Sequence, residues 1–308
     1  MKTIKGIAPA TVANVCCGFD VLGFAVDSPA DEVIATLRKE PGIRISKISG
    51  DNGRLPVDPE RNTASVAVQS MLRHLQTTQG IEIELIKKLP LGSGMGSSAA
   101  SAIAALVAVN HLLGTPLSRM DLVVHAMEAE RIACGSAHAD NVAPSLLGGF
   151  VLIRSYDPLD IVKVPSPEDL LCTLIHPHLE LKTEDSRKVL RGAISLKDAV
   201  VQSGNIAALM IGLAQNNYEL ISRSLHDVIA EPIRSVFIPG FEAIKNTVKQ
   251  CGALGFGISG SGPTVFALCK DPATANSAGA AAVVHFEKMN LASDVYISNI
   301  NREGARLA

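Results

Sequence analysis

The stretch Pro90-Leu-Gly-Ser-Gly-Met-Gly-Ser-Ser-Ala-Ala100 lies between a predicted strand and a predicted helix. Residues 81–86 alternate apolar and acidic side chains, which is typical of a half-buried strand, and Pro90 ends that strand. Residues 97–113 carry apolar side chains at helical spacing on an alanine background and stop at Gly114. The glycine-rich turn therefore opens a helix.

This turn has the composition of a phosphate-binding loop. Its three glycines, Gly92, Gly94 and Gly96, allow the backbone to approach a ligand and to present successive amides to it. The positive end of the following helix faces any anion in the turn. Ser97 and Ser98 can either cap the helix or offer hydroxyls. The alternative is a plain connection with capping serines, but such a connection needs one glycine rather than three.

The turn is not a P-loop, because it lacks the lysine that a P-loop places just before its Ser or Thr. The charge of a phosphate therefore has to be balanced by the helix end, by a metal ion and by nearby basic groups such as Lys87 and Lys88. Glu130, in a helix predicted at residues 121–133, is a candidate metal ligand if it faces Ser98, since a hydroxyl and a carboxylate can hold Mg²⁺ together with water and phosphate. The alternative for Glu130 is a solvated charge on the helix surface.

Composition places the chain among globular proteins and excludes several functional classes. Its 308 residues are 47% hydrophobic and 19% charged, and 28 basic against 30 acidic residues give a net charge of −2. Without a basic stretch, nucleic acid is not an expected partner. The most apolar run, residues 99–109, is too short for a membrane span, and we expect no export signal. The six cysteines form no CxxC pair, which favours reduced thiols and a cytoplasmic location.

Residues 255–268 contain a second glycine cluster, Gly-Phe-Gly-Ile-Ser-Gly-Ser-Gly-Pro-Thr-Val-Phe-Ala-Leu. Gly255, Gly257 and Gly260 match the GxGxxG pattern of dinucleotide-binding folds, but that pattern requires a helix next. Here Pro263 and the apolar run after it predict a strand instead. We therefore expect a strand-turn-strand unit whose backbone comes close to a ligand or to the other domain.

The chain is long enough for two domains. A Pro- and Asp-rich stretch at residues 156–168 is the candidate boundary, and it divides the chain into residues 1–160 and 161–308. The second part ends with a predicted helix at residues 273–288 and a predicted strand at residues 294–299. This alternation is typical of an α+β domain with a mostly antiparallel sheet.

Polar side chains outside the glycine turn are further candidates for ligand binding. Asn14 and Asp20 lie in a predicted loop between two strands, where turn formation is the alternative explanation. The run from His138 to Asn141 places several polar groups just before an apolar segment. Either Asp140 or Asn141 can also be a simple helix cap.

Two arginines in the second part of the chain are candidates for anion binding. Arg187 lies in a helix predicted at residues 183–190, and Arg234 lies between two other predicted helices. A guanidinium group binds a carboxylate through two parallel hydrogen bonds. The alternative for each arginine is an ion pair on the protein surface.

Three separated motifs resemble the three signature motifs of the GHMP kinase family. They are the segment Ala8-Pro-Ala-Thr with Asn14 and Gly18-Phe-Asp20, the turn at residues 90–100, and Gly257-Ile-Ser-Gly-Ser-Gly-Pro263. The match spans nearly the whole chain, and three motifs in order are more specific than any one of them. The family phosphorylates small alcohols such as galactose, homoserine and mevalonate with ATP. The resemblance therefore implies a small-molecule kinase.

The resemblance also implies a fold and cofactors. We expect a two-domain α+β fold, with an N-terminal α/β domain that has a mixed sheet and a phosphate loop before a helix, and a C-terminal ferredoxin-like α+β domain. ATP and Mg²⁺ are the implied cofactors, and a homodimer is the implied assembly. Members that phosphorylate homoserine in threonine biosynthesis are most similar around Asn14 and Asp20 and at residues 138–141, 183–187 and 231–234. L-homoserine is therefore the expected substrate. The alternatives are another alcohol, such as mevalonate, shikimate or a sugar, and a non-catalytic ATP-binding sensor.

The same resemblance implies roles for individual residues. ATP is expected at Asn62, Lys87, Pro90, Gly92, Ser93, Gly94, Gly96, Ser97 and Ser98. Mg²⁺ is expected at Ser98 and Glu130. The substrate is expected at Asn14, Asp20, His138, Asn141, Thr183, Arg187, Arg234 and Gly260. The expected catalytic residues are Asn141, Arg187 and Glu130. An amino-acid substrate needs an anion for its ammonium group, which Asp20 supplies, and cations for its carboxylate.

Catalysis is expected to proceed without a general base. In mevalonate-type members of the family a catalytic aspartate lies seven residues before a double glycine, and Asn141 occupies that position relative to Gly148. An amide cannot accept the proton of the substrate hydroxyl. The hypothesis is therefore catalysis by positioning and charge neutralisation, with the proton lost late to the γ-phosphate. Asp140 is the alternative base if the chain is shifted by one residue.

Overall fold

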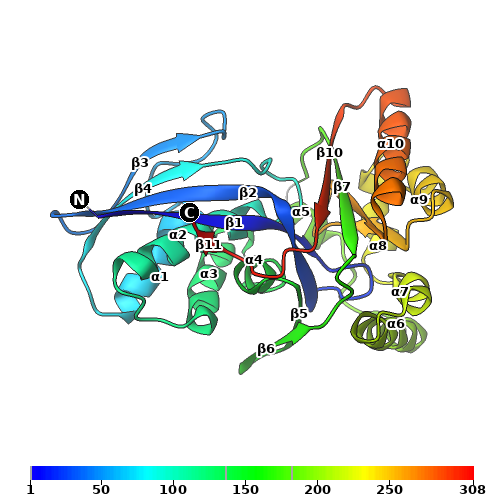
Figure 1. Ribbon diagram of the computed structural model, residues 1–308, viewed down its shortest axis with the longest axis horizontal. Helices are drawn as coiled ribbons and strands as arrows, with labels where there is room; N and C mark the ends of the chain where they lie inside the picture. Colours follow the sequence, from blue (N-terminus) through cyan, green and yellow to red (C-terminus); the bar gives the residue numbers. More distant parts are fainter. Residues whose placement is uncertain (1, 136, 182) are drawn as a thin grey trace.

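The structure of the chain, a computed structural model, describes residues 2–135, 137–181 and 183–308. These residues form two β-sheets that lie toward opposite ends of the long axis of the molecule (Figure 1). The first sheet has seven strands in the order β11-β1-β2-β4-β3, with β5 paired to β2 and β6 paired to β5. These strands are β1 (Thr3–Ala13), β2 (Leu22–Arg38), β3 (Ile43–Ser49), β4 (Gly80–Ile86), β5 (Phe150–Tyr156), β6 (Leu159–Val164) and β11 (Arg306–Leu307). The sheet is mixed as expected, because β3 and β4 are parallel while the other pairs are antiparallel.

Helix α2 (Ser97–Leu112) is the central element of the first part. It packs on β1 and β2 on one side and on α1 (Thr63–His74) and α3 (Arg119–Cys134) on the other. Its many alanines allow this close packing from both sides, because a helix that is buried all round must be apolar all round. A Cβ atom built on Gly6 of β1 would lie 2.2 Å from the carbonyl oxygen of Ala104, so strand and helix backbones are in contact there. The short helix α4 (Val142–Leu147) also packs on α2.

The second sheet has four antiparallel strands in the order β10-β7-β9-β8. They are β7 (Leu171–Pro177), β8 (Gly255–Ile258), β9 (Val265–Cys269) and β10 (Ser293–Asn299). The helices of this part are α5 (Thr183–Lys188), α6 (Leu196–Ala214), α7 (Tyr218–Ser224), α8 (Glu231–Arg234), η1 (Ser235–Phe237), α9 (Phe241–Gln250) and α10 (Pro272–Lys288). With the helices between β7 and β8 counted as one crossover, the order is β-α-β-β-α-β, which is the ferredoxin-like arrangement. The predicted strand-turn-strand unit is confirmed as the β8–β9 pair.

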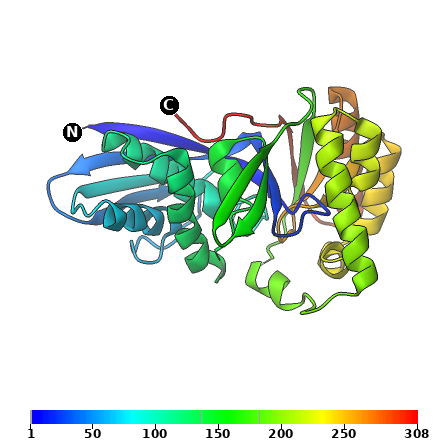
Figure 2. The ribbon, with the colours of Figure 1, turned by 90° about the horizontal axis from the view of Figure 1, so that it is seen from below.

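The chain changes from one sheet to the other between Val164 and Leu171, a few residues after the boundary expected at residue 160. Its last segment then returns to the first sheet, where β11 pairs with β1. Figure 2, seen from below, places the cyan and green helices of the first part at one end and the yellow-green helices of the second part at the other.

A continuous apolar core joins the two parts. The ring centroid of Phe24 in β2 lies 4.6 Å from that of Phe150 and 6.1 Å from that of Phe266 in β9. All three rings are fully buried, so the two sheets are held in a defined relative position. Among the described residues, no helix is both long enough and apolar enough to cross a bilayer.

Candidate active site

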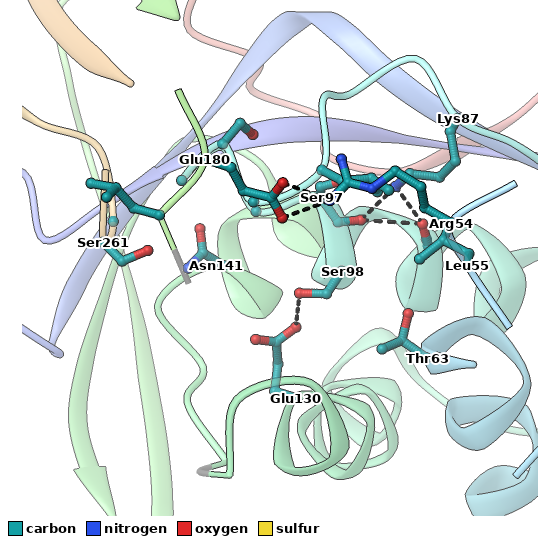
Figure 3. Close-up of a pocket in the computed structure, with 18 of the residues that line it drawn as sticks. Arg54, Leu55, Thr63, Lys87, Ser97, Ser98, Glu130, Asn141, Glu180 and Ser261 are labelled. Atoms are coloured by element: carbon teal, nitrogen blue, oxygen red, sulfur yellow. Dashed lines mark hydrogen bonds and ion pairs between the residues drawn. The ribbon is translucent and has the colours of Figure 1, made fainter. Parts of the chain in front are cut away.

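A pocket of about 460 Å³ lies at the N-terminus of α2, between the two sheets. It brings together many residues that the sequence singles out: Asn62, Lys87, Gly92, Ser93, Gly94, Gly96, Ser97, Ser98, Glu130, Asn141 and Gly260. Figure 3 shows that its labelled residues come from several elements far apart in the chain. Pro90 does not line this pocket and instead lines a neighbouring hollow of about 440 Å³.

The glycine turn is enclosed by the other two motifs. A Cβ atom on Gly94 would lie 2.4 Å from the carbonyl oxygen of Ser259, and one on Gly96 would lie 2.1 Å from Oγ1 of Thr11. Both glycines have left-handed φ values, 82° and 68°. Ser259 also donates a hydrogen bond from its hydroxyl to the carbonyl oxygen of Gly94, at 2.8 Å. Glycine is therefore required at both positions, by close contact and by backbone conformation.

The serine hydroxyls after the turn do not cap the helix. The N-cap of α2 is Gly96, which has no side-chain cap hydrogen bond. Oγ of Ser97 accepts a hydrogen bond from Nζ of Lys87 at 2.7 Å, and the Ser98 hydroxyl donates to Oε1 of Glu130 at 2.6 Å. The first turn of the helix thus leaves its amides directed at the pocket, where they favour an anion.

Lys87 is buried behind the glycine turn and stabilises it. Its ammonium group is buried in an ion pair with Asp31 and also donates to the Ser97 carbonyl oxygen at 2.9 Å and to the Ser101 hydroxyl at 2.8 Å. Burial lowers the pKa of Lys87, and the Asp31 carboxylate opposes that shift. Asp31 in turn accepts hydrogen bonds from the backbone amides of Lys88 and Leu89, which lead into the turn. Lys88 itself forms an exposed ion pair with Glu32.

Ser98 and Glu130 form a pair of oxygen ligands beside the turn (Figure 3). Glu130 lies on α3 with a side chain that is only 7% exposed, so the condition that it faces Ser98 is met. One carboxylate and one hydroxyl suit Mg²⁺, which usually keeps several waters and takes further ligands from phosphate oxygens. No cluster of three or more His, Cys, Asp or Glu side chains suited to a metal occurs among the described residues.

A second polar cluster lies beyond the pocket, around Asp20 and two arginines. The Arg187 guanidinium donates to both carboxylate oxygens of Asp20, at 3.0 and 2.9 Å. Arg234 is buried and donates to the carbonyl oxygens of Gly260 at 3.1 Å and Ser186 at 3.3 Å. The guanidinium carbon atoms of Arg187 and Arg234 lie 5.8 and 5.3 Å from the centroid of the Phe19 ring. Burial lowers the pKa of Arg234, with the positive charge of Arg187 acting in the same direction.

Asn14 connects this cluster to the pocket. Its amide nitrogen donates to the carbonyl oxygen of Gly260 at 2.8 Å, and its amide oxygen accepts from the backbone amide of Asp20 at 3.0 Å. Asn14, Cys16 and Asp20 have φ values of 72°, 58° and 59°, an unusual backbone for non-glycine residues. The hydrogen bond from the Asp20 amide to Asn14 fixes the backbone of Asp20 in this conformation.

His138 presents an unused ring nitrogen to the same cluster. Its Nδ1 lies 3.9 Å from Oδ2 of Asp20, while its Nε2 is buried and has no hydrogen-bond partner in the part of the chain that the structure describes. Burial lowers the pKa of His138, which the charge of Asp20 opposes. A buried polar atom without a partner costs free energy unless a ligand satisfies it. Thr183, which is also predicted to bind the substrate, begins α5, and its side chain lies outside the described residues.

Asn141 and Asp140 differ in their access to the pocket. Asn141 lines it, and its Oδ1 accepts a hydrogen bond from the Thr11 hydroxyl at 2.7 Å, which leaves its amide nitrogen as a donor. Asn141 is the N-cap of α4 but makes no side-chain cap bond, so the capping alternative does not apply. Asp140 is buried and does not line the pocket. Burial, with the charges of Asp20 and Glu130, raises the pKa of Asp140 from its usual 3.8 to about 7.

Comparison with known proteins agrees with this geometry. The family model for the GHMP kinases N terminal domain matches residues 62–149, and that for the GHMP kinases C terminal domain matches residues 205–287. The chain is 54% identical over 319 aligned residues to a homoserine kinase of Chlorobium phaeobacteroides, with 100% of both chains covered. The chain belongs to the GHMP kinase family. Membership of this kinase family implies the use of ATP.

Two further relatives of this GHMP kinase support the assignment. A homoserine kinase of Chlorobaculum tepidum is 50% identical, with 100% of this chain and 98% of the relative covered. The crystal structure of homoserine kinase from Cytophaga hutchinsonii matches with a TM-score of 0.97 at 54% identity, over 100% of this chain and 98% of that one. Both the family and the two-domain α+β fold expected from the three motifs are therefore confirmed.

Several residues of this GHMP kinase site were not singled out by the sequence reasoning. Thr11 lies within the first motif but received no role, and its hydrogen bond to Asn141 spans 130 residues. Asp31 lies in β2 among alternating residues, and no local pattern marks it as the partner of Lys87. Arg54 and Glu180 line the pocket from loops without any motif. Only Thr11 had a signal in the sequence that could have found it.

Proposed function

We propose that this chain transfers the γ-phosphoryl group of ATP to the side-chain hydroxyl of L-homoserine, giving O-phospho-L-homoserine and ADP. The observation that carries this proposal is the position of Gly260. It lines the pocket of the glycine turn, and its carbonyl oxygen accepts hydrogen bonds from Arg234 and Asn14 of the second cluster. A substrate held by that cluster therefore has its free end directed toward the phosphate site.

The second cluster has the charges that a zwitterionic amino acid requires. The carboxylate of Asp20 suits an ammonium group, and the guanidinium groups of Arg187 and Arg234 suit a carboxylate. In the structure, Asp20 and Arg187 pair with each other. A zwitterion can replace that pair by offering each group a partner of opposite charge, so neither charge is left unpaired. Nε2 of His138, which has no hydrogen-bond partner among the residues that the structure describes, adds one polar contact for the substrate.

The nucleotide is proposed to bind with its phosphates on the glycine turn. Amides of the turn and the N-terminus of α2 would contact the phosphate oxygens. Lys87 and Asp31 would keep the turn in place through the contacts to Ser97 and Ser101. Ser98 and Glu130 are the residues that would hold Mg²⁺, whose charge would neutralise part of the phosphate charge.

The reaction is proposed to depend on positioning rather than on a general base. The substrate oxygen forms a bond to the γ-phosphorus as the bond to the bridging oxygen of ADP breaks, and the hydroxyl proton passes late to a γ-phosphate oxygen. Asn141 supports this scheme, because Thr11 fixes its amide oxygen and leaves an N–H donor facing the pocket. A donor stabilises developing negative charge but accepts no proton.

The test is a coupled ADP-release assay with Mg-ATP and a panel of L-homoserine, L-serine, L-threonine, mevalonate, galactose and shikimate. We expect turnover on homoserine to exceed that on every other compound. Turnover on another alcohol would keep the kinase assignment and overturn the substrate. ATP binding without turnover on the whole panel would favour the non-catalytic sensor.

Substitution of Asp140 by Asn tests the alternative base and has a pH signature. We expect near-normal turnover, because Asp140 is buried away from the pocket. Since burial raises its pKa to about 7 in the folded protein, the folded state binds more protons than the unfolded state between about pH 4 and pH 7. Wild-type stability should therefore fall as pH rises through this range. The Asn variant should unfold at the same temperature as wild type near pH 4 and be more stable at pH 8, by an upper limit of about 4 kcal/mol.

Thermal unfolding measured by circular dichroism, together with the ADP-release assay, checks both parts of this prediction. A loss of several orders of magnitude in kcat would instead restore Asp140 as the general base. Equal stability of the variant and wild type at pH 8 would contradict the raised pKa.

A further inference from the structure

An ion pair crosses the pocket from one part of the molecule to the other. Nη2 of Arg54 lies 2.7 Å from Oε1 and 2.6 Å from Oε2 of Glu180. Arg54 belongs to the loop between β3 and α1, and Glu180 follows β7 of the second sheet. Both residues line the pocket, and both side chains are about half exposed, at 49% and 46%. The dashed lines in Figure 3 show this pair above the Ser98–Glu130 contact.

The carboxylate of this pair lies against the glycine turn. A Cβ atom on Gly92 would be 2.8 Å from Cγ and 3.1 Å from Oε1 of Glu180. Gly92 has a φ of 64° and belongs to the turn that presents its amides to an anion. Glu180 therefore places a negative charge, held by an arginine, beside the place where the phosphates are proposed to bind.

Arg54 is more available to a ligand than Lys87, another basic residue that lines the pocket. Lys87 is buried and bound to Asp31, Ser97 and Ser101, so its ammonium group is already fully used by the protein. The partner of Arg54 is a half-exposed carboxylate, and ion pairs of this exposure are weak and easily exchanged. A guanidinium group accommodates a phosphate in the same two-point geometry as a carboxylate.

We propose that Arg54 binds the phosphates of the nucleotide and that Glu180 is an internal competing anion, which occupies Arg54 until the nucleotide displaces it. This inference rests on the proposed function, because it takes the pocket as the nucleotide site. A polyphosphate on the glycine turn repels the nearby carboxylate and attracts the guanidinium group, so the exchange follows from charge.

Replacing Arg54 and replacing Glu180 are predicted to change the affinity for the nucleotide in opposite directions. Replacing Arg54 by Ala removes a phosphate contact, and we expect the Kd for Mg-ADP and the KM for ATP to rise about 10- to 30-fold. Replacing Glu180 by Gln removes the competitor and keeps the size of the side chain, so both constants should fall about 3-fold. Arg54→Lys keeps the positive charge but loses the two-point geometry of the guanidinium group. Its Kd for Mg-ADP and its KM for ATP should therefore lie between those of Arg54→Ala and wild type. The KM for homoserine should stay within about 2-fold of wild type in all three variants.

Isothermal titration calorimetry with Mg-ADP measures binding without any phosphoryl transfer. A matched control is Arg154→Ala, which breaks the exposed Arg154–Asp160 ion pair elsewhere on the surface and should change neither constant. In Arg54→Ala the unpaired Glu180 adds repulsion, so the double variant Arg54→Ala/Glu180→Gln separates the two contributions. It should still bind Mg-ADP more weakly than Glu180→Gln alone.

The outcomes are distinguishable from one another. Weaker binding in both single variants would mean that the pair only ties the two parts together, and it would overturn the proposal. Unchanged binding in both would overturn it as well. Turnover of homoserine by the wild-type protein is measured first. Once that turnover is established, Kd values for Mg-ADP that differ from those predicted for the variants count against the roles of Arg54 and Glu180 alone. A wild-type protein that binds Mg-ADP but does not phosphorylate homoserine counts against the proposed substrate. In that case the Kd values of the variants still test the roles of Arg54 and Glu180.

Discussion

Replacing Glu130 by Gln is expected to lower kcat roughly 1,000-fold, because the change removes the carboxylate that is proposed, with Ser98, to hold the Mg²⁺ whose charge balances that of the phosphates at the N-terminus of α2. The amide has the same shape and can still accept the hydrogen bond from the Ser98 hydroxyl. The fold should therefore survive, and the loss should appear in the dependence of the rate on Mg²⁺ concentration. Steady-state ADP release at a series of Mg²⁺ concentrations measures it.

A neighbouring glutamate on the same helix provides the control. Glu128 lies two residues before Glu130 on α3 and forms an exposed ion pair with Arg131, so Glu128→Gln should keep normal turnover. Circular dichroism should give a melting temperature for Glu130→Gln within a few degrees of wild type. Normal kcat in a folded Glu130→Gln protein would remove this residue from the metal site.

Replacing Arg187 by Ala is expected to raise the KM for homoserine on the order of 100-fold, with the KM for ATP nearly unchanged. The guanidinium group pairs with Asp20 at two points and is one-third exposed, so it is accessible to a substrate carboxylate. Arg187→Lys should recover only part of the loss, because the ammonium group lacks the two-point geometry. Arg187 is a better choice for this test than Arg234, whose burial makes unfolding a second consequence of its replacement.

A substrate without the carboxylate makes this experiment selective. Turnover of 3-aminopropan-1-ol should be poor in the wild-type protein and should change little in Arg187→Ala, since the contact under test is absent from that compound. Arg223→Ala, which breaks an exposed ion pair with Glu219 on α7, should behave like wild type. An equal rise of KM for both compounds would mean that Arg187 supports the loop of Asp20 rather than the substrate carboxylate.

Local patterns were sufficient to predict the elements that carry the site. The alternation at residues 81–86 and the alanine-rich run after Gly96 correspond to β4 and α2, because strand and helix periods are properties of short segments. The strand after Pro263 was likewise predictable, and it excluded a dinucleotide-binding fold. Three motifs in order were enough to predict the family and the two-domain fold.

The tertiary structure decided how these groups act on one another. The sequence left open whether Ser97 and Ser98 cap α2 or offer hydroxyls, and the structure directs them to Lys87 and Glu130. It likewise left Asn141 and Asp140 as alternatives, and only the packing of α4 shows which of them lines the pocket. Pro90 belongs to the motif and yet faces a different hollow.

What the sequence alone determined about this protein is therefore its elements, its family and the kinds of side chain at its site. Only the tertiary structure showed the Lys87–Asp31 support, the Asp20–Arg187 pair and the Arg54–Glu180 pair, whose partners are 56, 167 and 126 residues apart. The physical reason is that period and turn chemistry act over a few residues, whereas ion pairs at long separation depend on the register of the sheets and the packing of the core between them.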